Sequence, residues 1–267
     1  MVWSAGIRTA SAELPTLSKQ PWMGYFTGLE SKKFNFGVNG LGKITINVLN
    51  SKGEEVSHSL TIPIYVGIEE TTPNGKTILR EIKPESLSSA DPAKEELEKT
   101  TIKGQVTGDA SFELYLEEAR GLVQIGGRIT DPGTLTKNPI RFVARVRFPS
   151  AYSRVKTDDK KSEKEFEEKL EKDRIDLKWS DGKRVKQTFE KPVDATTTEL
   201  NGPGIVAAEM ECGAYQGRKI LLMASENSSM SLWNSESKPL HEGFSLNWAP
   251  NAEKDKEGKS RLIIDVR

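Results

Sequence analysis

The chain has 267 residues, of which 35% are hydrophobic, and its 39 Lys and Arg residues balance 39 Asp and Glu residues to a formal net charge of zero. A domain that neutralises nucleic-acid phosphates usually carries a basic excess, so this balance argues against a nucleic-acid partner. No run of about 18 apolar residues occurs, which excludes a membrane-spanning helix and predicts a soluble protein.

The N-terminal segment, residues 1–19, is polar and lacks the apolar stretch of an intact secretory signal. We expect it to be disordered, or to be the trimmed remnant of a signal, because Ala10-Ser11-Ala12 has the small-x-small form of a signal-peptidase site. The second alternative favours a secreted or periplasmic bacterial protein. A cytoplasmic location stays open, since the single cysteine, Cys212, rules out an intrachain disulfide but says little about the compartment.

Alternation of apolar and polar residues with a period of two is the dominant pattern, and it predicts β-strands. The run 43–48 alternates throughout, and 50–53 supplies turn residues before a second run at 56–66, which together predict a hairpin. Further strands of the first half are expected at 111–116, 122–129 and 141–148.

The second half of the chain shows the same pattern. The runs 174–179 and 185–189 flank the turn 180–183, Ser-Asp-Gly-Lys, and form the clearest hairpin signature of the sequence. Four more strands are expected at 205–212, 219–224, 244–248 and 261–266. The short turns between these runs favour an antiparallel arrangement.

One charged surface helix is expected at 158–172. Its opposite charges recur four residues apart, and each such pair stabilises a helix by about 0.2–0.5 kcal/mol. Phe166 and Leu170 are its only apolar residues, so it can dock on a sheet but cannot form a core of its own. A shorter helix is expected at 92–99, where Asp91 is a good N-cap.

These elements predict an all-β fold, an antiparallel β-sandwich of jelly-roll or concanavalin-like type. The favoured organisation has a β-sandwich domain at 20–152, a charged helical linker or insertion at 153–172, and a second β-domain at 173–267. Each half holds enough strands for a sandwich of its own. The alternative is that 173–267 forms the second half of one sandwich.

Several chemistries lack the residues that they need. The only histidines, His58 and His241, have no histidine or carboxylate beside them at ligand spacing, and no Gly-x-Ser-x-Gly motif occurs. The glycine-rich stretch 37–42 joins two expected strands and opens no helix, so it is no phosphate loop. We therefore predict no metal site and no cofactor.

Glu209 and Glu211 are the weak candidates for a catalytic pair. A glycosidase needs two carboxylates about 5–10 Å apart, and same-face neighbours on a strand are about 6.5–7 Å apart. The alternative role is structural, because carboxylates on a sheet face commonly neutralise basic neighbours. Arg141, Arg145 and Arg147 form such a basic row.

Aromatic side chains are the candidates for ligand binding, because sugar rings stack on exposed aromatic faces. Strand parity places Trp179 and Trp248 in the core. Trp22 and Tyr25 lie in a Gly- and Pro-flanked segment before the first clear strand, and Trp233 lies beside Asn234 at the end of a run. We expect these three residues, Trp22, Tyr25 and Trp233, to be exposed and to bind the ligand.

Together these observations favour a non-enzymatic, extracytoplasmic β-sandwich module that binds a polysaccharide or a surface protein. One alternative is a glycan-active β-sandwich enzyme that uses the Glu209 and Glu211 pair. The other is a structural or assembly component whose exposed strand edges pair with another subunit.

Overall fold

The computed structural model describes residues 24–89, 96–152, 160–197, 200, 204–234 and 237–267, which form 17 β-strands and one α-helix. The strands before the helix are β1 (Tyr25–Glu30), β2 (Phe34–Asn39), β3 (Ile44–Val48), β4 (Ile62–Thr71), β5 (Thr77–Leu79), β6 (Ile82–Ser89), β7 (Lys99–Val106), β8 (Ser111–Ala119), β9 (Leu122–Asp131) and β10 (Ile140–Phe148). The helix is α1 (Lys160–Leu170). It is followed by β11 (Arg174–Trp179), β12 (Arg184–Thr188), β13 (Ile205–Glu211), β14 (Lys219–Ala224), β15 (Ser228–Trp233), β16 (Phe244–Pro250) and β17 (Leu262–Val266).

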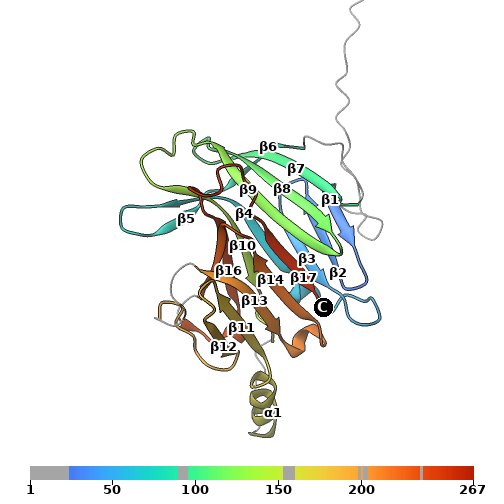
Figure 1. Cartoon of the computed structure of the whole chain (residues 1–267). Coiled ribbons are helices and arrows are strands. Elements are labelled where there is room, and N and C mark those ends of the chain that lie inside the picture. Colours follow the sequence, from blue (N-terminus) through green and yellow to red (C-terminus); the bar gives the residue numbers. More distant parts are fainter. Residues whose placement is uncertain (1–23, 90–95, 153–159, 198–199, 201–203, 235–236) are drawn as a thin grey trace, which may run out of the picture.

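All the strand pairs are antiparallel, and they join into one continuous sheet that nearly closes into a barrel (Figure 1). One layer has the order β1-β2-β3-β4-β10-β16-β15, and the other has β13-β14-β17-β9-β8-β7-β6. A single residue pair, Ile205 with Met230, connects the layers at one side. The predicted all-β antiparallel sandwich is therefore confirmed.

Apolar residues of both layers form one core. Trp248 of β16 is fully buried and meets the ring of Phe142 edge-on, at 6.5 Å between ring centroids. Gly127 of β9 permits this close packing, because a Cβ at that position would lie 2.3 Å from the Phe142 ring. As predicted from strand parity, Trp179 and Trp248 both lie in the core.

Strands of the two expected units, 20–152 and 173–267, are hydrogen-bonded to each other. β10 pairs with β16 over five residues, and β9 pairs with β17 over three. Side chains from both units also belong to the same core cluster. The expected N-terminal segment, 1–19, lies outside the described residues.

Helix α1 confirms the expected surface helix and projects from one end of the sandwich (Figure 1). Leu170 is buried and Phe166 is half-buried, so the helix docks through the two apolar residues that the sequence offers. The Phe166 ring meets Tyr152 and His241 edge-on, each at 5.7 Å between centroids. Most of the expected helix at 92–99 lies outside the described residues, and Lys99 begins β7.

Two strand predictions for the second half are matched in full, since β11 and β14 have the predicted bounds, whereas β15 was not predicted. The predicted hairpin of 43–48 and 56–66 forms, because β3 pairs with β4. Its second strand, however, begins later in the chain than predicted. Residues 58–60 form a 3-10 turn, and β4 begins only at Ile62. The turn forms because the Ser57 hydroxyl caps it by accepting a hydrogen bond from the Ser59 amide.

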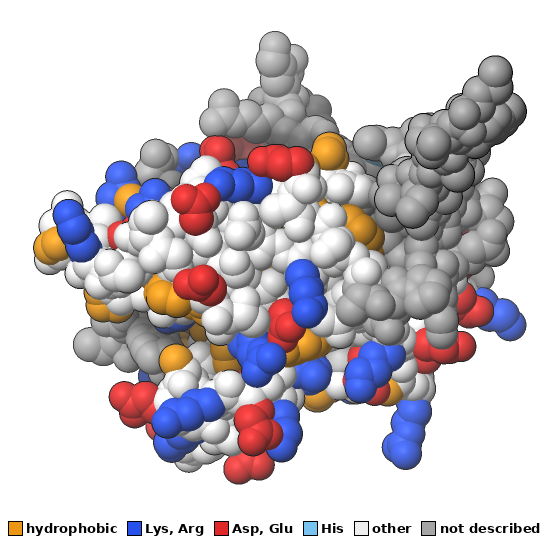
Figure 2. Space-filling view, turned by 90° about the horizontal axis from the view of Figure 1, so that it is seen from above, with side chains coloured by type: hydrophobic (Ala, Val, Ile, Leu, Met, Phe, Trp, Pro, Cys, Tyr) orange, Lys and Arg blue, Asp and Glu red, His pale blue; other side chains and the backbone are white. Residues whose placement is uncertain are grey.

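Acidic and basic side chains are interspersed over the face seen in Figure 2. No helix in the described part of the chain combines the length and the apolar character needed to cross a membrane.

Candidate functional site

A hollow of about 320 Å³ lies on the outer face of the layer formed by β4, β10, β16 and β15. The β5 strand, which pairs with the end of β4, borders it. Its lining is mostly polar and aromatic, and consists of Tyr65, Thr77, Leu79, Arg145, Arg147, Trp233, Ser245 and Asn247. This volume lies at the small end of the range for ligand pockets, about 300–1,000 Å³.

Strand parity decides which side chains face the hollow. On β10 the buried Ala144 and Val146 alternate with Arg145 and Arg147, which therefore lie on the outer face. The same alternation holds on β4, where Tyr65 lies between two buried residues.

The register of the four strands gathers the outward-facing side chains into two rows. The first row consists of Tyr65, Arg145 and Asn247, and the second consists of Arg147, Ser245 and Trp233. Neighbouring strands are about 4.8 Å apart, so Tyr65 on β4 and Trp233 on β15 are separated by roughly 14 Å across the sheet. The polar side chains lie between these two aromatic residues.

Tyr65 and Trp233 are exposed although both are large. Trp233 is 54% exposed and Tyr65 is 43% exposed, and only Leu41 and Ile78 join them as exposed large hydrophobic side chains among the described residues. Exposed aromatic faces beside a hollow offer stacking surfaces to a ligand.

Glu69 organises the arginines beside the hollow. Its side chain is only 2% exposed, and its Oε1 accepts hydrogen bonds from Arg141 Nε at 2.8 Å and Arg141 Nη2 at 2.5 Å. Its Oε2 accepts a hydrogen bond from Arg145. Both carboxylate oxygens are thus engaged, while Arg147 forms no ion pair with a described residue.

Two buried polar atoms at the hollow have unused hydrogen-bonding capacity. Neither Arg145 Nε nor Asn247 Oδ1 has a hydrogen-bond partner within the described residues. Eight other side-chain atoms among the described residues are in the same state, so this is not a property of the hollow alone.

The predicted ligand-binding residues have different outcomes. Trp233 lies in the hollow. Tyr25 was expected to be exposed, and that expectation is wrong, because only 6% of the residue is exposed. Burial also raises the pKa of the Tyr25 hydroxyl. Trp22 lies outside the described residues.

Glu209 and Glu211 lie on one face of β13, as predicted, but both are in ion pairs. Glu211 lies 2.5 Å from Arg174 Nη2 and 3.1 Å from Lys219 Nζ. Glu209 lies 3.3 Å from Arg267 Nη1. Carboxylates that neutralise basic neighbours across a sheet face commonly have a structural role. The geometry favours the structural role for this pair.

Cys212 belongs to a buried polar cluster under α1. Its Sγ lies 3.1 Å from Asp173 Oδ2, which also accepts a hydrogen bond from the Tyr152 hydroxyl at 2.6 Å. Burial and the Asp173 charge raise the pKa of the Cys212 thiol to about 12. The thiol is therefore protonated at neutral pH and unreactive.

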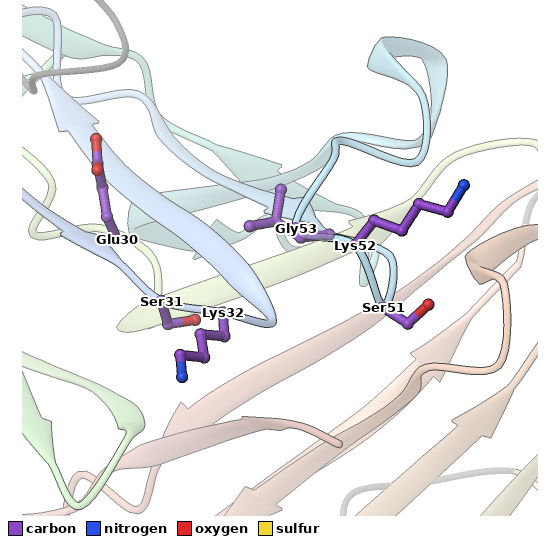
Figure 3. Close-up of a pocket in the computed structure, with 7 residues that line it drawn as sticks. Glu30, Ser31, Lys32, Ser51, Lys52 and Gly53 are labelled. Atoms are coloured by element: carbon purple, nitrogen blue, oxygen red, sulfur yellow. The ribbon is translucent and has the colours of Figure 1, made fainter.

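A second hollow, of about 620 Å³, lies between the β1–β2 turn and the loop after β3 (Figure 3). Its two lysines, Lys32 and Lys52, extend away from one another. Arg218 connects the two loops, because it donates to the backbone oxygens of Leu49 at 2.8 Å and Asn50 at 3.0 Å in one loop and of Lys32 at 3.5 Å in the other. With diverging charges and no aromatic residue in its lining, this hollow is the weaker candidate.

The part of the chain that the structure describes contains no group of three or more His, Cys, Asp and Glu side chains that could hold a metal ion. The predicted basic row is present, but sequence reasoning assigned it to neutralising Glu209 and Glu211. It missed Tyr65, Ser245 and Asn247, whose only sequence signal is a polar or tyrosine residue at the outward parity of an apolar strand.

The fold and the hollow together define an antiparallel β-sandwich protein with an aromatic-rimmed polar site on one sheet face. No protein-family model matches the chain, and no curated protein matches it. Among solved structures, the chain is similar to the α-N-acetylgalactosaminidase NagBb from Bifidobacterium bifidum in complex with GalNAc, with 11% sequence identity and a TM-score of 0.48. The match covers 90% of this chain and only 35% of that chain. A likeness at this level carries no functional argument.

Proposed function

We propose that the protein is a non-enzymatic binding module that recognises a glycan in the hollow between Tyr65 and Trp233. The observation that carries this proposal is the placement of two exposed aromatic side chains on either side of a polar floor. Sugars have apolar C–H faces that stack on aromatic rings and hydroxyl groups that need hydrogen-bond partners, and this hollow offers both.

The polar floor supplies the hydrogen-bonding groups that a sugar requires. Arginine offers donors in a planar fork, an asparagine amide offers both donors and an acceptor, and a serine hydroxyl can do either. Arg145, Asn247 and Ser245 place these groups on two adjacent strands, β10 and β16. Such a mixture suits the vicinal hydroxyls of a sugar ring.

The roughly 14 Å between the two aromatic strands exceeds one sugar ring, so the ligand proposed is a short stretch of polysaccharide rather than a monosaccharide. Polysaccharides of this kind occur outside the cytoplasm. The proposed location is therefore secreted or periplasmic.

Affinity electrophoresis in native gels cast with a panel of neutral and acidic polysaccharides tests the proposal. We expect at least one polysaccharide to retard the protein, and Trp233→Ala and Tyr65→Ala each to weaken the retardation by about tenfold or more, since an aromatic stacking contact is commonly worth 1–3 kcal/mol. Leu41→Ala is the matched control, because Leu41 is also exposed, at 56%, but lies outside the hollow.

The same samples are assayed for released reducing ends. Retardation without release supports the binding module. Release that disappears in Glu209→Gln or Glu211→Gln contradicts it and restores the paired carboxylates as catalytic candidates. If no polysaccharide retards the protein, or if Trp233→Ala behaves like Leu41→Ala, the proposal fails.

A further inference from the structure

The charge of the hollow is unbalanced, although the chain as a whole has no net charge. The outer face of β10 presents Arg141, Arg145 and Arg147, and the acidic residue in contact with this row is Glu69. None of the residues that line the hollow is acidic. Among the described residues, these three arginines against one glutamate leave two positive charges at this face.

Glu69 cannot neutralise Arg147. Glu69 lies directly opposite Arg141 in the β4–β10 pairing, and its two oxygens bind Arg141 and Arg145. Arg147 lies further along β10, is exposed, and makes no ion pair with any residue that the structure describes. It therefore has its full hydrogen-bonding capacity available to a ligand.

Several arginines on or beside other strands are in ion pairs. Arg128 of β9 lies 2.9 Å from Glu113, and Arg174 of β11 lies 2.5 Å from Glu211. Arg267, beside the end of β17, lies 2.7 Å from Asp265. Arg184 on β12 also lacks an ion pair with a described residue, so what distinguishes Arg147 is its place in the hollow beside Arg145 and Trp233.

We propose that the glycan bound in the hollow is acidic, and that the carboxylate of a uronic acid residue binds between Arg145 and Arg147 while its ring or a neighbouring ring stacks on Trp233. This inference rests on the proposed glycan-binding function. Arg145 and Arg147 are same-face neighbours on one strand, about 6.5–7 Å apart, so one anionic group between them can reach both guanidinium groups. The planar guanidinium fork matches a carboxylate in shape as well as in charge.

Matched pairs of ligands test the inference. Titration calorimetry compares uronate oligosaccharides, namely oligogalacturonate, oligomannuronate and hyaluronan fragments, with the same oligosaccharides after methyl esterification, which removes the charge and keeps the backbone. We expect at least one uronate to bind about tenfold or more tighter than its ester. We also expect this preference to shrink as the salt concentration rises.

Two variants distinguish the contribution of the arginine charge to binding from the contribution of aromatic stacking. Arg147→Gln removes a charge that no described residue uses, so the fold is expected to persist, as a thermal melt would verify. It should lower uronate affinity about tenfold and ester affinity by clearly less, whereas Trp233→Ala should lower both by similar factors. Arg184→Gln on β12 is the control, because it removes an equally exposed arginine from a different strand.

The outcomes distinguish this inference from the function on which it rests. If glycans bind with no preference for the uronate, or if Arg147→Gln has no more effect than Arg184→Gln, the acidic-ligand inference is overturned and the glycan-binding function stands. If only dextran sulfate or a single-stranded DNA oligonucleotide binds, the carboxylate assignment is overturned. If no glycan binds and Trp233→Ala changes nothing, both proposals are overturned.

Discussion

The outer faces of β10 and β13 carry alternating charged side chains on strands of similar length, yet they use these charges differently. On β13, Glu209 and Glu211 are matched by Arg267, Lys219 and Arg174 from the neighbouring elements. On β10, the buried Glu69 binds two arginines and leaves the third without an ion pair among the described residues.

This difference in ion pairing indicates which of the two faces is available to a ligand. Ion pairs that are complete within the fold have little to gain from binding, and exposed pairs contribute little to stability. The β10 face has a guanidinium without an ion pair among the described residues, and two exposed aromatic rings border its hollow. The sequence pattern indicated the carboxylates of β13 as candidate catalytic residues. The strand register instead favours the arginines of β10 as candidate ligand-binding residues.

The largest expected effect on stability comes from Glu69→Gln, which breaks the arrangement on the β10 face. Removing one partner of a buried ion pair commonly costs about 3 kcal/mol, because the remaining charges lose their compensation. We expect the free energy of unfolding, measured by urea denaturation, to fall by about that amount. Glu167→Gln on the exposed face of α1 is the control, with an expected change within about 0.5 kcal/mol. Equal effects of the two substitutions would show that Glu69 does not organise the arginines.

The expected effect of Glu113, on β8, on stability lies between the effect of Glu69 and the effects of the two β13 glutamates. The Tyr115 hydroxyl donates to Glu113 at 2.6 Å and Arg128 Nε donates at 2.9 Å, and these hydrogen bonds hold the pKa of the Glu113 carboxyl below its usual value of 4.5. We expect Glu113→Gln to cost about 2 kcal/mol at pH 7, in line with hydrogen bonds to a charged group.

The sign of the pH dependence of Glu113 follows from linkage. Because the folded protein has the lower pKa, the stability that Glu113 supplies is present above pH 4.5 and is lost as the pH falls through the folded value. The difference in melting temperature between the wild type and Glu113→Gln should therefore shrink from pH 7 towards pH 3. A difference that stays constant over this range would contradict the assignment.

The smallest effects are expected on the β13 face. Glu209→Gln and Glu211→Gln should each lower the free energy of unfolding by less than about 1 kcal/mol, since their ion pairs are partly exposed. Neither should change the affinity for any ligand of the hollow. A substantial loss of affinity in either variant would place the ligand on β13 instead and would reverse the comparison.

Much of the fold could be predicted because β-sandwich strands have a local signal. Each of β8 to β11 has one buried face, so apolar residues recur at every second position. β15 was missed, since it carries serines at three of its six positions and reads as a loop. Its partners β16 and β13 impose the strand, and no property of its own sequence does so.

The sequence by itself determined the alternating strands, the charged helix with its Phe166 and Leu170 stripe, and the exposure of Trp233, because each follows from residues close together in the chain. Only the tertiary structure decided that Tyr25 is buried and that Tyr65, Arg147 and Trp233 border one hollow. Tyr65 and Trp233 lie on strands that are far apart in the sequence. The register of β4, β10, β16 and β15 brings them together, and that register is set by pairing between distant segments, for which a single sequence carries no local signal.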